Sequence, residues 1–240
     1  MSTFTHVLQP MYTDCYSQAS PAELARLIIG DTVIQMDYDG IPRQRLVVEK
    51  HGVWMADKFR LEQFKPITFL REMTIALSQR RERGVRVYYT ASVMCSGEPI
   101  ANAQICFVAV AYEDRRILRL AELAPMWNTP AQTCEPMRKA RFTGEMRLKK
   151  TEHVRYSDCD LNHHLSSPKY LDFVCDVTDY WTGAEKLCAL MQIDFVSECL
   201  PDSELRLFTA QNSDAGYVRG AHADGKTAFD AVYQYCNIGC

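Results

Sequence analysis

The stretch that decides the fold is YSDCDLNHHLSSP, residues 156–168, because a shorter form of it, YTDCYSQASP, occurs at residues 12–21. Both begin with Tyr, a hydroxyl residue, Asp and Cys, and both end in Ser-Pro. Further along the chain, Pro66 aligns with Pro201 in the same order. Matches that keep a common order indicate an internal repeat. We therefore predict two copies of one structural unit.

The repeat sets the expected domain boundaries. We place an N-terminal unit at residues 1–120, a linker at 121–144 and a C-terminal unit at 145–240. The linker region has three prolines within residues 122–136 and no clear period, which is typical of irregular structure. Trp127 in this linker could be held against a domain surface. Units of roughly 100–120 residues agree with ordinary domain sizes.

Each copy places a helix directly after the repeated loop. In the first copy Ser20 is a plausible N-cap, Pro21 suits the first helical position, and Glu23 would complete a capping box. In the second copy we predict Ser167 as the cap and Pro168 as the first helical residue. The second helix is expected to carry apolar residues at helical spacing and to stop at Gly183: Tyr170, Val174, Val177 and Trp181.

The remainder of each copy reads as strand. Residues 85–93 alternate apolar and polar side chains with the period of a half-buried strand, and residues 105–111 are almost continuously apolar. The second copy repeats this pattern at residues 217–223 and 227–236. A long helix packed on an antiparallel sheet is an α+β unit known as the hotdog fold. Two tandem units predict a double hotdog.

Composition excludes several classes of protein. The 240 residues carry a net charge of −3, with 47% apolar and 24% charged residues, which is ordinary for a globular chain and argues against a dedicated nucleic-acid binder. No apolar run approaches the roughly 20 residues of a membrane span. The ten cysteines include no C-x-x-C motif, and the first residues lack the pattern of a signal peptide. We expect a cytoplasmic protein whose thiols are free and mostly buried.

The densest group of polar residues precedes the second helix. Asp160, Asn162 and His164 lie within five residues and supply an acceptor, donors and a titratable imidazole. A helix N-terminus offers unpaired N–H groups that can hold a developing oxyanion. The alternative is an Asx-rich turn that only caps the helix. That alternative accounts for Asp160 and Asn162 but gives no reason for His164.

Two motifs resemble those of a known family. Asp160-x-Asn162-x-His164, with Lys-Tyr-Leu-Asp at residues 169–172, resembles the signature of acyl-acyl carrier protein (acyl-ACP) thioesterases. Residues 193–201, IDFVSECLP, resemble the second motif of that family, a strand that ends in Glu-Cys. Parts of the first half are also similar to the N-terminal hotdog of the family. Leu-Ser-Ser at residues 165–167 replaces the usual Val-Asn-Asn, which puts the geometry of the substrate loop in question.

The resemblance implies hydrolysis of the thioester between a fatty acyl group and the phosphopantetheine arm of acyl carrier protein, without metal or organic cofactor. It also implies one of two catalytic sets. In the first, Glu198 activates water with support from Asp160, Asn162 and His164; in the second, Cys199 acts as nucleophile with His164 and Asn162. Glu198 and Cys199 would be neighbours on a strand and point to opposite faces. We favour Glu198, because its partners can orient a water without a thiolate.

The first copy lacks this chemistry. Its loop has neither His nor Asn, and Gln63 aligns with Glu198. We expect the first unit to be catalytically silent and to house the acyl chain in an apolar slot. Two other functions remain open. One is an acyl-coenzyme A thioesterase of the same fold, and the other is a non-enzymatic acyl-binding protein.

Basic residues matter because the expected partner, acyl carrier protein, is acidic. One basic group is Arg80, Arg81 and Arg83, and the other is Lys139, Arg141, Arg147, Lys149 and Lys150. Either group could steer the carrier protein or could be an ordinary solvated face. We expect no zinc site, because His163 and His164 have no third ligand at metal spacing. A homodimer is left open, because two fused hotdogs already supply the pairing that single ones obtain by dimerising.

Overall fold

The computed structural model describes residues 2–40, 43–178 and 186–238, and a large antiparallel sheet dominates it. The strands of the first half are β1 (Ser2–Val7), β2 (Gly52–Gln63), β3 (Glu72–Leu77), β4 (Arg81–Arg83), β5 (Arg86–Cys95) and β6 (Glu98–Ala111). Those that follow are β7 (Gln132–Thr133), β8 (Arg147–His153), β9 (Lys186–Phe195), β10 (Glu204–Gln211), β11 (Gly216–His222) and β12 (Thr227–Asn237). The helices are α1 (Pro21–Tyr38), α2 (Arg43–Lys50), α3 (Leu120–Leu123) and α4 (Ser167–Val177), with 3-10 turns η1 (Pro10–Tyr12), η2 (Ala124–Met126) and η3 (Tyr156–Asp158).

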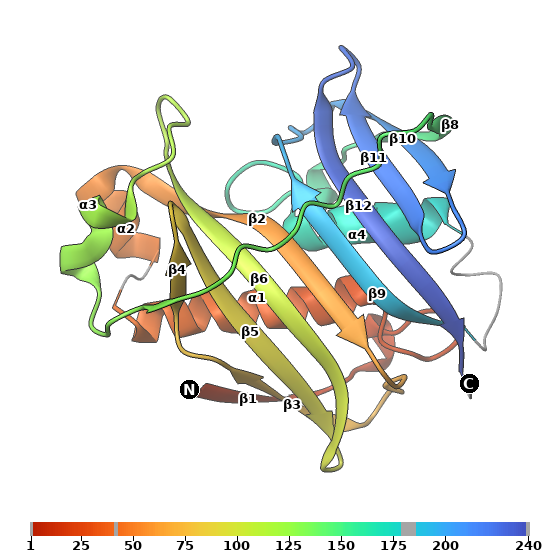
Figure 1. Cartoon of the computed structure of the whole chain (residues 1–240), viewed down its shortest axis with the longest axis horizontal. Coiled ribbons are helices and arrows are strands. Elements are labelled where there is room, and N and C mark those ends of the chain that lie inside the picture. The colour runs from red at the N-terminus through yellow and green to blue at the C-terminus, as the bar shows by residue number, and fades with distance from the viewer. Residues whose placement is uncertain (1, 41–42, 179–185, 239–240) are drawn as a thin grey trace.

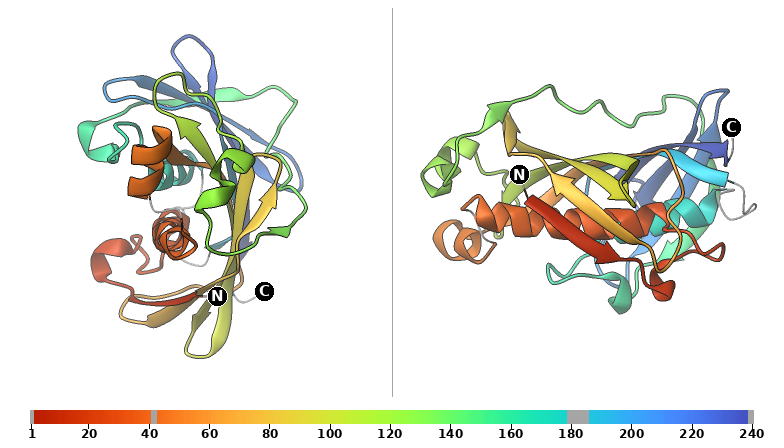
Figure 2. Two further views of the ribbon diagram at one scale, coloured as in Figure 1. Left: turned by 90° about the vertical axis from the view of Figure 1, so that its left-hand side faces the viewer. Right: turned by 90° about the horizontal axis from the view of Figure 1, so that it is seen from below.

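The two halves of the sheet have the same strand order when each is read outward from the centre. The main path is β1-β3-β5-β6-β2-β9-β12-β11-β10-β8. Along this path each half has one strand that precedes its long helix in the chain and four strands that follow it. The halves join where β2 and β9 pair antiparallel, for example Phe59 with Ile193 and Leu61 with Met191. Helices α1 and α4 contact each other and cover one face of the continuous sheet (Figures 1 and 2). This arrangement is the predicted α+β double hotdog.

Helix α1 begins as its sequence predicts. The Ser20 hydroxyl accepts a hydrogen bond from the Glu23 amide at 3.1 Å, and Pro21 occupies the first turn, where its missing N–H costs nothing. The Glu23 carboxylate pairs with Arg26, so the second hydrogen bond of a capping box is not made there. Arg26 also reaches Asp172 of α4 at 3.8 Å and thereby links the two long helices.

The predicted start of α4 is wrong by one residue. Ser166 is the N-cap, with extended backbone, whereas Ser167 already has helical conformation and Pro168 follows it. The Ser166 side chain makes no capping hydrogen bond. The expected continuation through Trp181 to a stop at Gly183 lies outside the described residues, which resume at residue 186.

The alternating strand prediction is confirmed by β5. Val87, Tyr89, Ala91 and Val93 are buried against the helices, as the period-two pattern requires. The expected strands at residues 105–111, 217–223 and 227–236 correspond to the end of β6, to β11 and to β12. The cysteine prediction holds only in part. Among the nine cysteines of the described residues, all unpaired, three are fully buried and two are exposed.

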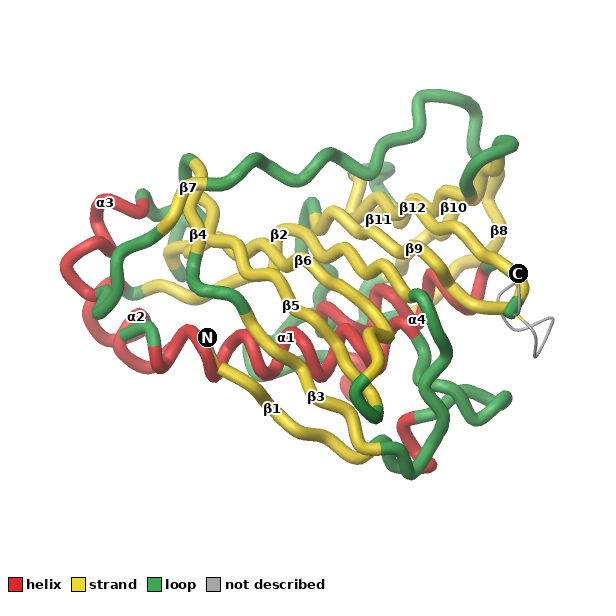
Figure 3. Tube along the Cα trace, turned by 60° about the horizontal axis from the view of Figure 1, so that its bottom comes forward, coloured by secondary structure: helices red, strands yellow, loops and turns green. Residues whose placement is uncertain are grey.

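The chain between β7 and β8 crosses the face of the sheet opposite α1 and α4 (Figures 2 and 3). Hydrogen bonds to the central strands hold it there: Gln192 donates to the Arg138 carbonyl at 2.7 Å, and the Ala140 amide donates to Asp194 at 3.2 Å. Earlier in the linker, on the helix side of the sheet, Trp127 packs on Trp54 of β2 with ring centroids 6.0 Å apart. The linker is therefore bound at Trp127 and again at residues 138–140.

Candidate functional site

The loop before α4 folds on itself through local hydrogen bonds. The Asp160 carboxylate accepts a hydrogen bond from the backbone N–H of Asn162 at 2.8 Å, and the backbone N–H of Asp160 donates to the His164 carbonyl at 3.0 Å. His163 supports the reversal with a φ of +61°, in the left-handed region. The Asx turn considered from the sequence is therefore present, and one Asp160 oxygen is used in it. The turn aims the side chains that follow it.

His164 is the most distinctive group of this loop. Its ring is buried, with 7% of the residue exposed, and Nδ1 lies 3.0 Å from the Leu165 carbonyl oxygen. A carbonyl can only accept, so Nδ1 carries the proton and Nε2 presents a lone pair. Nε2 has no hydrogen-bond partner among the described residues. The imidazole is thus held in the tautomer that a proton acceptor needs.

Glu198 and Cys199 lie beside this loop, but not on a strand as predicted. Strand β9 ends at Phe195, and both residues belong to the loop that follows. The Leu165 amide donates to the Cys199 carbonyl at 2.8 Å, which joins this loop to the His164 loop. Strand alternation therefore does not govern the two side chains. They nevertheless differ: the Cys199 side chain is fully buried, whereas that of Glu198 is 22% exposed.

The surroundings of Cys199 disfavour a thiolate. Burial raises the pKa of the thiol to about 11, against the smaller lowering effect of the Tyr170 hydroxyl. The backbone amide of Cys199 donates to that same hydroxyl at 3.2 Å. A nucleophilic cysteine normally has a lowered pKa next to a cation or a helix N-terminus. At neutral pH the thiol is therefore almost wholly protonated.

Two arginines of the first half reach this site, and sequence reasoning missed both. Arg43, at the start of α2, donates to the Asn162 side-chain oxygen at 3.3 Å and to the Tyr112 hydroxyl at 3.3 Å. Arg115, in the loop after β6, pairs with Glu198 at 3.2 Å. Arg43 is separated from Asn162 by 119 residues, and the pairing of β2 with β9 brings the two halves together. No local pattern in the sequence marks either arginine.

The Arg43 contact also sets the direction of the Asn162 amide. A guanidinium group can only donate, so its partner must be the oxygen of the amide. The two N–H groups of Asn162 consequently point away from Arg43. They are available as donors to another oxygen.

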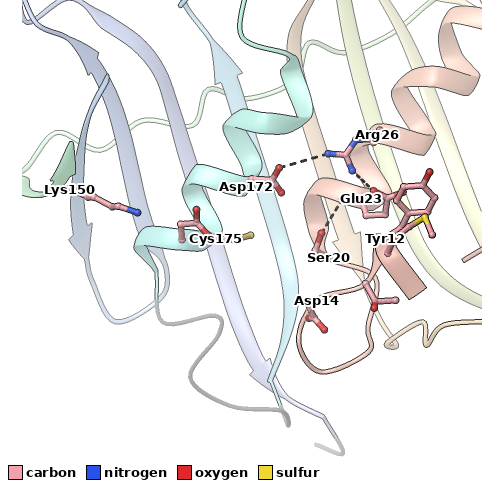
Figure 4. A pocket seen from close by; sticks show the side chains of 11 residues that line it. Tyr12, Asp14, Ser20, Glu23, Arg26, Lys150, Asp172 and Cys175 are labelled. Carbon is pink, nitrogen blue, oxygen red and sulfur yellow. Dashed lines mark hydrogen bonds and ion pairs between the residues drawn. The ribbon is translucent and has the colours of Figure 1, made fainter. Parts of the chain in front are cut away.

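The repeated loop in the first half opens onto a different groove. This groove has a volume of about 690 Å³ and lies between the loop at Tyr12–Asp14 and helix α4 (Figure 4). Its lining mixes apolar and polar side chains and contains no imidazole; Glu23, Arg26 and Asp172 form linked ion pairs across it. Burial raises the pKa of Glu23, although the neighbouring Arg26 opposes the shift. The groove therefore brings the repeated loop of the first half against α4 of the second half.

Fold and site together define a double-hotdog protein with a polar, imidazole-bearing loop before its second long helix. Residues 143–235 match the family model described as the acyl-ACP thioesterase C-terminal domain, so the C-terminal part of the chain carries the domain of that family. This match confirms the resemblance seen in the two motifs. No curated protein matches the sequence.

Solved structures resemble the whole chain. An acyl-ACP thioesterase from Bacteroides thetaiotaomicron is 15% identical with a TM-score of 0.83, over 98% of this chain and 97% of its own. A Lactobacillus plantarum protein described as an oleoyl thioesterase is 16% identical with a TM-score of 0.84, over 99% and 96%. The 12:0-ACP thioesterase of Umbellularia californica is 14% identical with a TM-score of 0.78, over 98% and 97%. These likenesses confirm the double-hotdog fold.

The described residues lack two kinds of feature. None of the helices there has the length and apolar character needed to cross a membrane. Within the same residues, no three or more His, Cys, Asp or Glu side chains are grouped to hold a metal ion.

Proposed function

We propose that this protein hydrolyses fatty acyl-ACP to free fatty acid and carrier protein by means of a carboxylate-activated water. The observation that carries the proposal is the buried His164 ring with a free Nε2 lone pair, in a loop bonded to the Glu198–Cys199 segment. The family match of residues 143–235 supports the same reaction. Glu198, Asp160, Asn162 and His164 form the proposed catalytic set.

In the proposed reaction one water is held by two acceptors. The Glu198 carboxylate takes a proton from the water while His164 Nε2 accepts the second hydrogen and orients the oxygen. That oxygen bonds to the thioester carbon, and the developing oxyanion is held by the Asn162 N–H groups and the first turn of α4. The carbon–sulfur bond then breaks, and the leaving thiolate takes the proton from Glu198. Asp160 shapes the turn that aims Asn162.

The first unit takes the binding role in this proposal. We assign residues 1–120 to a catalytically silent hotdog that houses the acyl chain, 121–144 to the linker and 145–240 to the catalytic hotdog. The first copy of the repeated loop, residues 12–21, contains neither His nor Asn, which supports silence in this unit. Arg43 and Arg115 nevertheless give the first unit a part in the catalytic geometry.

Burial withdraws one member of the first basic group from contact with a partner. Arg80 is buried, with 3% of the residue exposed, and its guanidinium lies 3.7 Å from the centre of the Trp127 ring. The interpretation of Arg80 as a steering residue is wrong, because a side chain covered by the linker cannot meet a partner. Lys139, Arg141, Arg147 and Lys149 are exposed. We propose this second group as the surface that attracts acidic acyl carrier protein.

The substrate is tested by hydrolysis rates on acyl-ACP and acyl-coenzyme A of the same chain length. We expect the carrier-protein ester to give a kcat/KM at least ten times higher. Charge reversal of Lys139 and Arg141 to Glu should reduce that ratio and leave the coenzyme A rate unchanged. Faster turnover of the coenzyme A ester would favour the second candidate activity. Tight fatty-acid binding without turnover of any thioester would favour an acyl-binding protein.

The choice between Glu198 and Cys199 is tested by Cys199→Ala. We expect kcat within about threefold of wild type, because a thiol with a pKa of about 11 contributes little thiolate at pH 7–8. An acyl-enzyme trapped by rapid acid quench would be sought in both proteins by intact mass spectrometry. Loss of all turnover in the folded variant, with a trapped acyl group in wild type, would establish the covalent route instead.

A further inference from the structure

A second set of unsatisfied polar groups lies in the first half, away from the His164 loop. We call it the Trp–Arg cluster: Gln35, Asp39, Trp54, Arg80, Tyr89 and Trp127. Its members come from the end of α1, from β2 and β5, from the segment before β4, and from the linker. Trp127 packs against Trp54 and under Arg80, which joins the linker to the inner side of the sheet.

Some polar atoms of the cluster are fully paired. Tyr89 donates to one oxygen of Asp39 at 2.6 Å, and the Gln35 amide donates to the other at 3.0 Å. Arg80 Nη2 donates to the Thr129 carbonyl at 2.7 Å, and Nε lies 3.0 Å from Glu82 in an ion pair. These contacts are enough to fasten the linker. A purely structural clamp would need no further donors.

Four other polar atoms of the cluster are buried without a hydrogen-bond partner in the described part of the chain. Three are donors, namely Arg80 Nη1 and the indole nitrogens of Trp54 and Trp127, and one is an acceptor, the Gln35 side-chain oxygen. Trp54 and Gln35 are only 8% and 5% exposed. Buried polar groups are nearly always paired, since leaving them unpaired is costly. A bound group that carries an oxygen could pair with these three donors and one acceptor in part.

The cluster lies at the same end of the sheet as the catalytic groups. Trp54 pairs with Ala109 near the end of β6, and the loop after β6 carries Arg115, which contacts Glu198. Asp39 is the C-cap of α1, and α2 then begins at Arg43, which contacts Asn162. The cluster thus lies between the helices and the sheet of the first half, at the end from which Arg43 and Arg115 reach the catalytic loop.

We propose that the Trp–Arg cluster belongs to the acyl-binding site and binds a hydroxyl group on the acyl chain. A hydroxyl can accept two hydrogen bonds and donate one, so it would pair with the Gln35 oxygen and with two of the three buried donors. A keto oxygen would leave Gln35 unpaired, and an unsubstituted chain would leave all four atoms unpaired. This inference rests on the proposed thioesterase function and names its substrate class as hydroxyacyl thioesters.

The test compares hydroxylated and plain acyl pantetheine thioesters of equal length, with the hydroxyl placed at successive carbons. For at least one position we expect kcat/KM to exceed that of the plain chain tenfold or more, since a site built for a hydroxyl discriminates against its absence. Trp54→Phe and Trp127→Phe each keep an aromatic ring and remove one N–H. In these variants the ratio of kcat/KM for the hydroxylated chain to kcat/KM for the plain chain should fall at least threefold.

Equal rates for plain and hydroxylated chains at every position would overturn the proposal. So would a preference that both Phe variants leave unchanged, which would place the hydroxyl elsewhere. A matched series of N-acetylcysteamine thioesters, which lack most of the pantetheine arm, distinguishes contacts to the acyl chain from contacts to the arm. If the hydroxyl preference is lost with this shorter arm, the cluster binds the pantetheine amides and the proposal is contradicted. If no thioester is hydrolysed, the proposed function fails, and calorimetric binding of free hydroxy fatty acids to wild type and Trp54→Phe still decides the role of the cluster.

Discussion

Thioester hydrolysis is expected to fall by at least about a thousandfold when His164 is replaced by alanine or Glu198 by glutamine. Each change removes an acceptor of a water proton, and a positioned acid or base contributes roughly 10²–10⁴-fold. Glu198→Gln keeps an oxygen for the 3.2 Å contact with Arg115 and loses the charge and the proton-accepting power. His164→Ala removes the free Nε2 lone pair. The measurement is kcat/KM on acyl-ACP at a substrate concentration below KM.

The controls separate chemistry from folding. His163→Asn changes the exposed neighbouring imidazole, and asparagine tolerates the positive φ of that position. This variant should keep nearly full activity. Circular dichroism and thermal melting should show that all three variants remain folded. Full activity in His164→Ala or in Glu198→Gln would remove that residue from the catalytic set.

The largest stability loss is expected from Asp194→Ala, at about 3–5 kcal/mol of unfolding free energy. Asp194 of β9 forms a buried ion pair with Lys58 of β2 across the seam between the two halves. It also accepts from the Ala140 amide of the linker at 3.2 Å and from Gln192 at 3.2 Å. The alanine variant leaves the Lys58 ammonium buried without its partner and frees the linker from the sheet. Urea unfolding followed by tryptophan fluorescence measures the change.

A paired variant tests whether the uncompensated charge is the cause. Lys58→Met combined with Asp194→Leu replaces both charges by apolar groups of similar size, and such replacements are often neutral or stabilising. We expect the double variant to recover more than half of the loss. A loss below 1 kcal/mol in Asp194→Ala would show that the pair contributes little to the seam. A double variant as unstable as the single one would assign the loss to the linker contacts.

Much of the fold was predictable because its signals are local. The repetition of residues 12–15 at residues 156–159 indicated two copies of one unit. The alternation of apolar and polar residues along β5 predicted both the strand and the side chains that it buries. The capping bond at Ser20 followed from residue type and spacing. The start of α4 was misplaced because two adjacent serines precede Pro168 and either can cap. The domain boundaries and the catalytic roles remain predictions.

The site was predictable only in its local part. Asp160, Asn162 and His164 share one short loop, so their proximity needs no tertiary information. Glu198 and Cys199 were expected to follow strand alternation, but β9 ends three residues earlier, and the backbone of a loop is not bound by that alternation. Arg80 was expected on the surface because residue type alone does not reveal that the linker will cover it.

The sequence by itself determined that the chain has two similar units, that each places a helix after a polar loop, and that only the second loop contains an imidazole. The tertiary structure decided which atoms of that loop are free to act. Pairing of β2 with β9 joins the halves and brings Arg43 to Asn162 and Arg115 to Glu198. Burial and one carbonyl hydrogen bond select the tautomer of His164, and burial holds Cys199 as a thiol. The carbonyl that fixes the tautomer belongs to the adjacent Leu165, but burial of the imidazole and of the thiol comes from neighbours distant in sequence and follows from the folded structure alone.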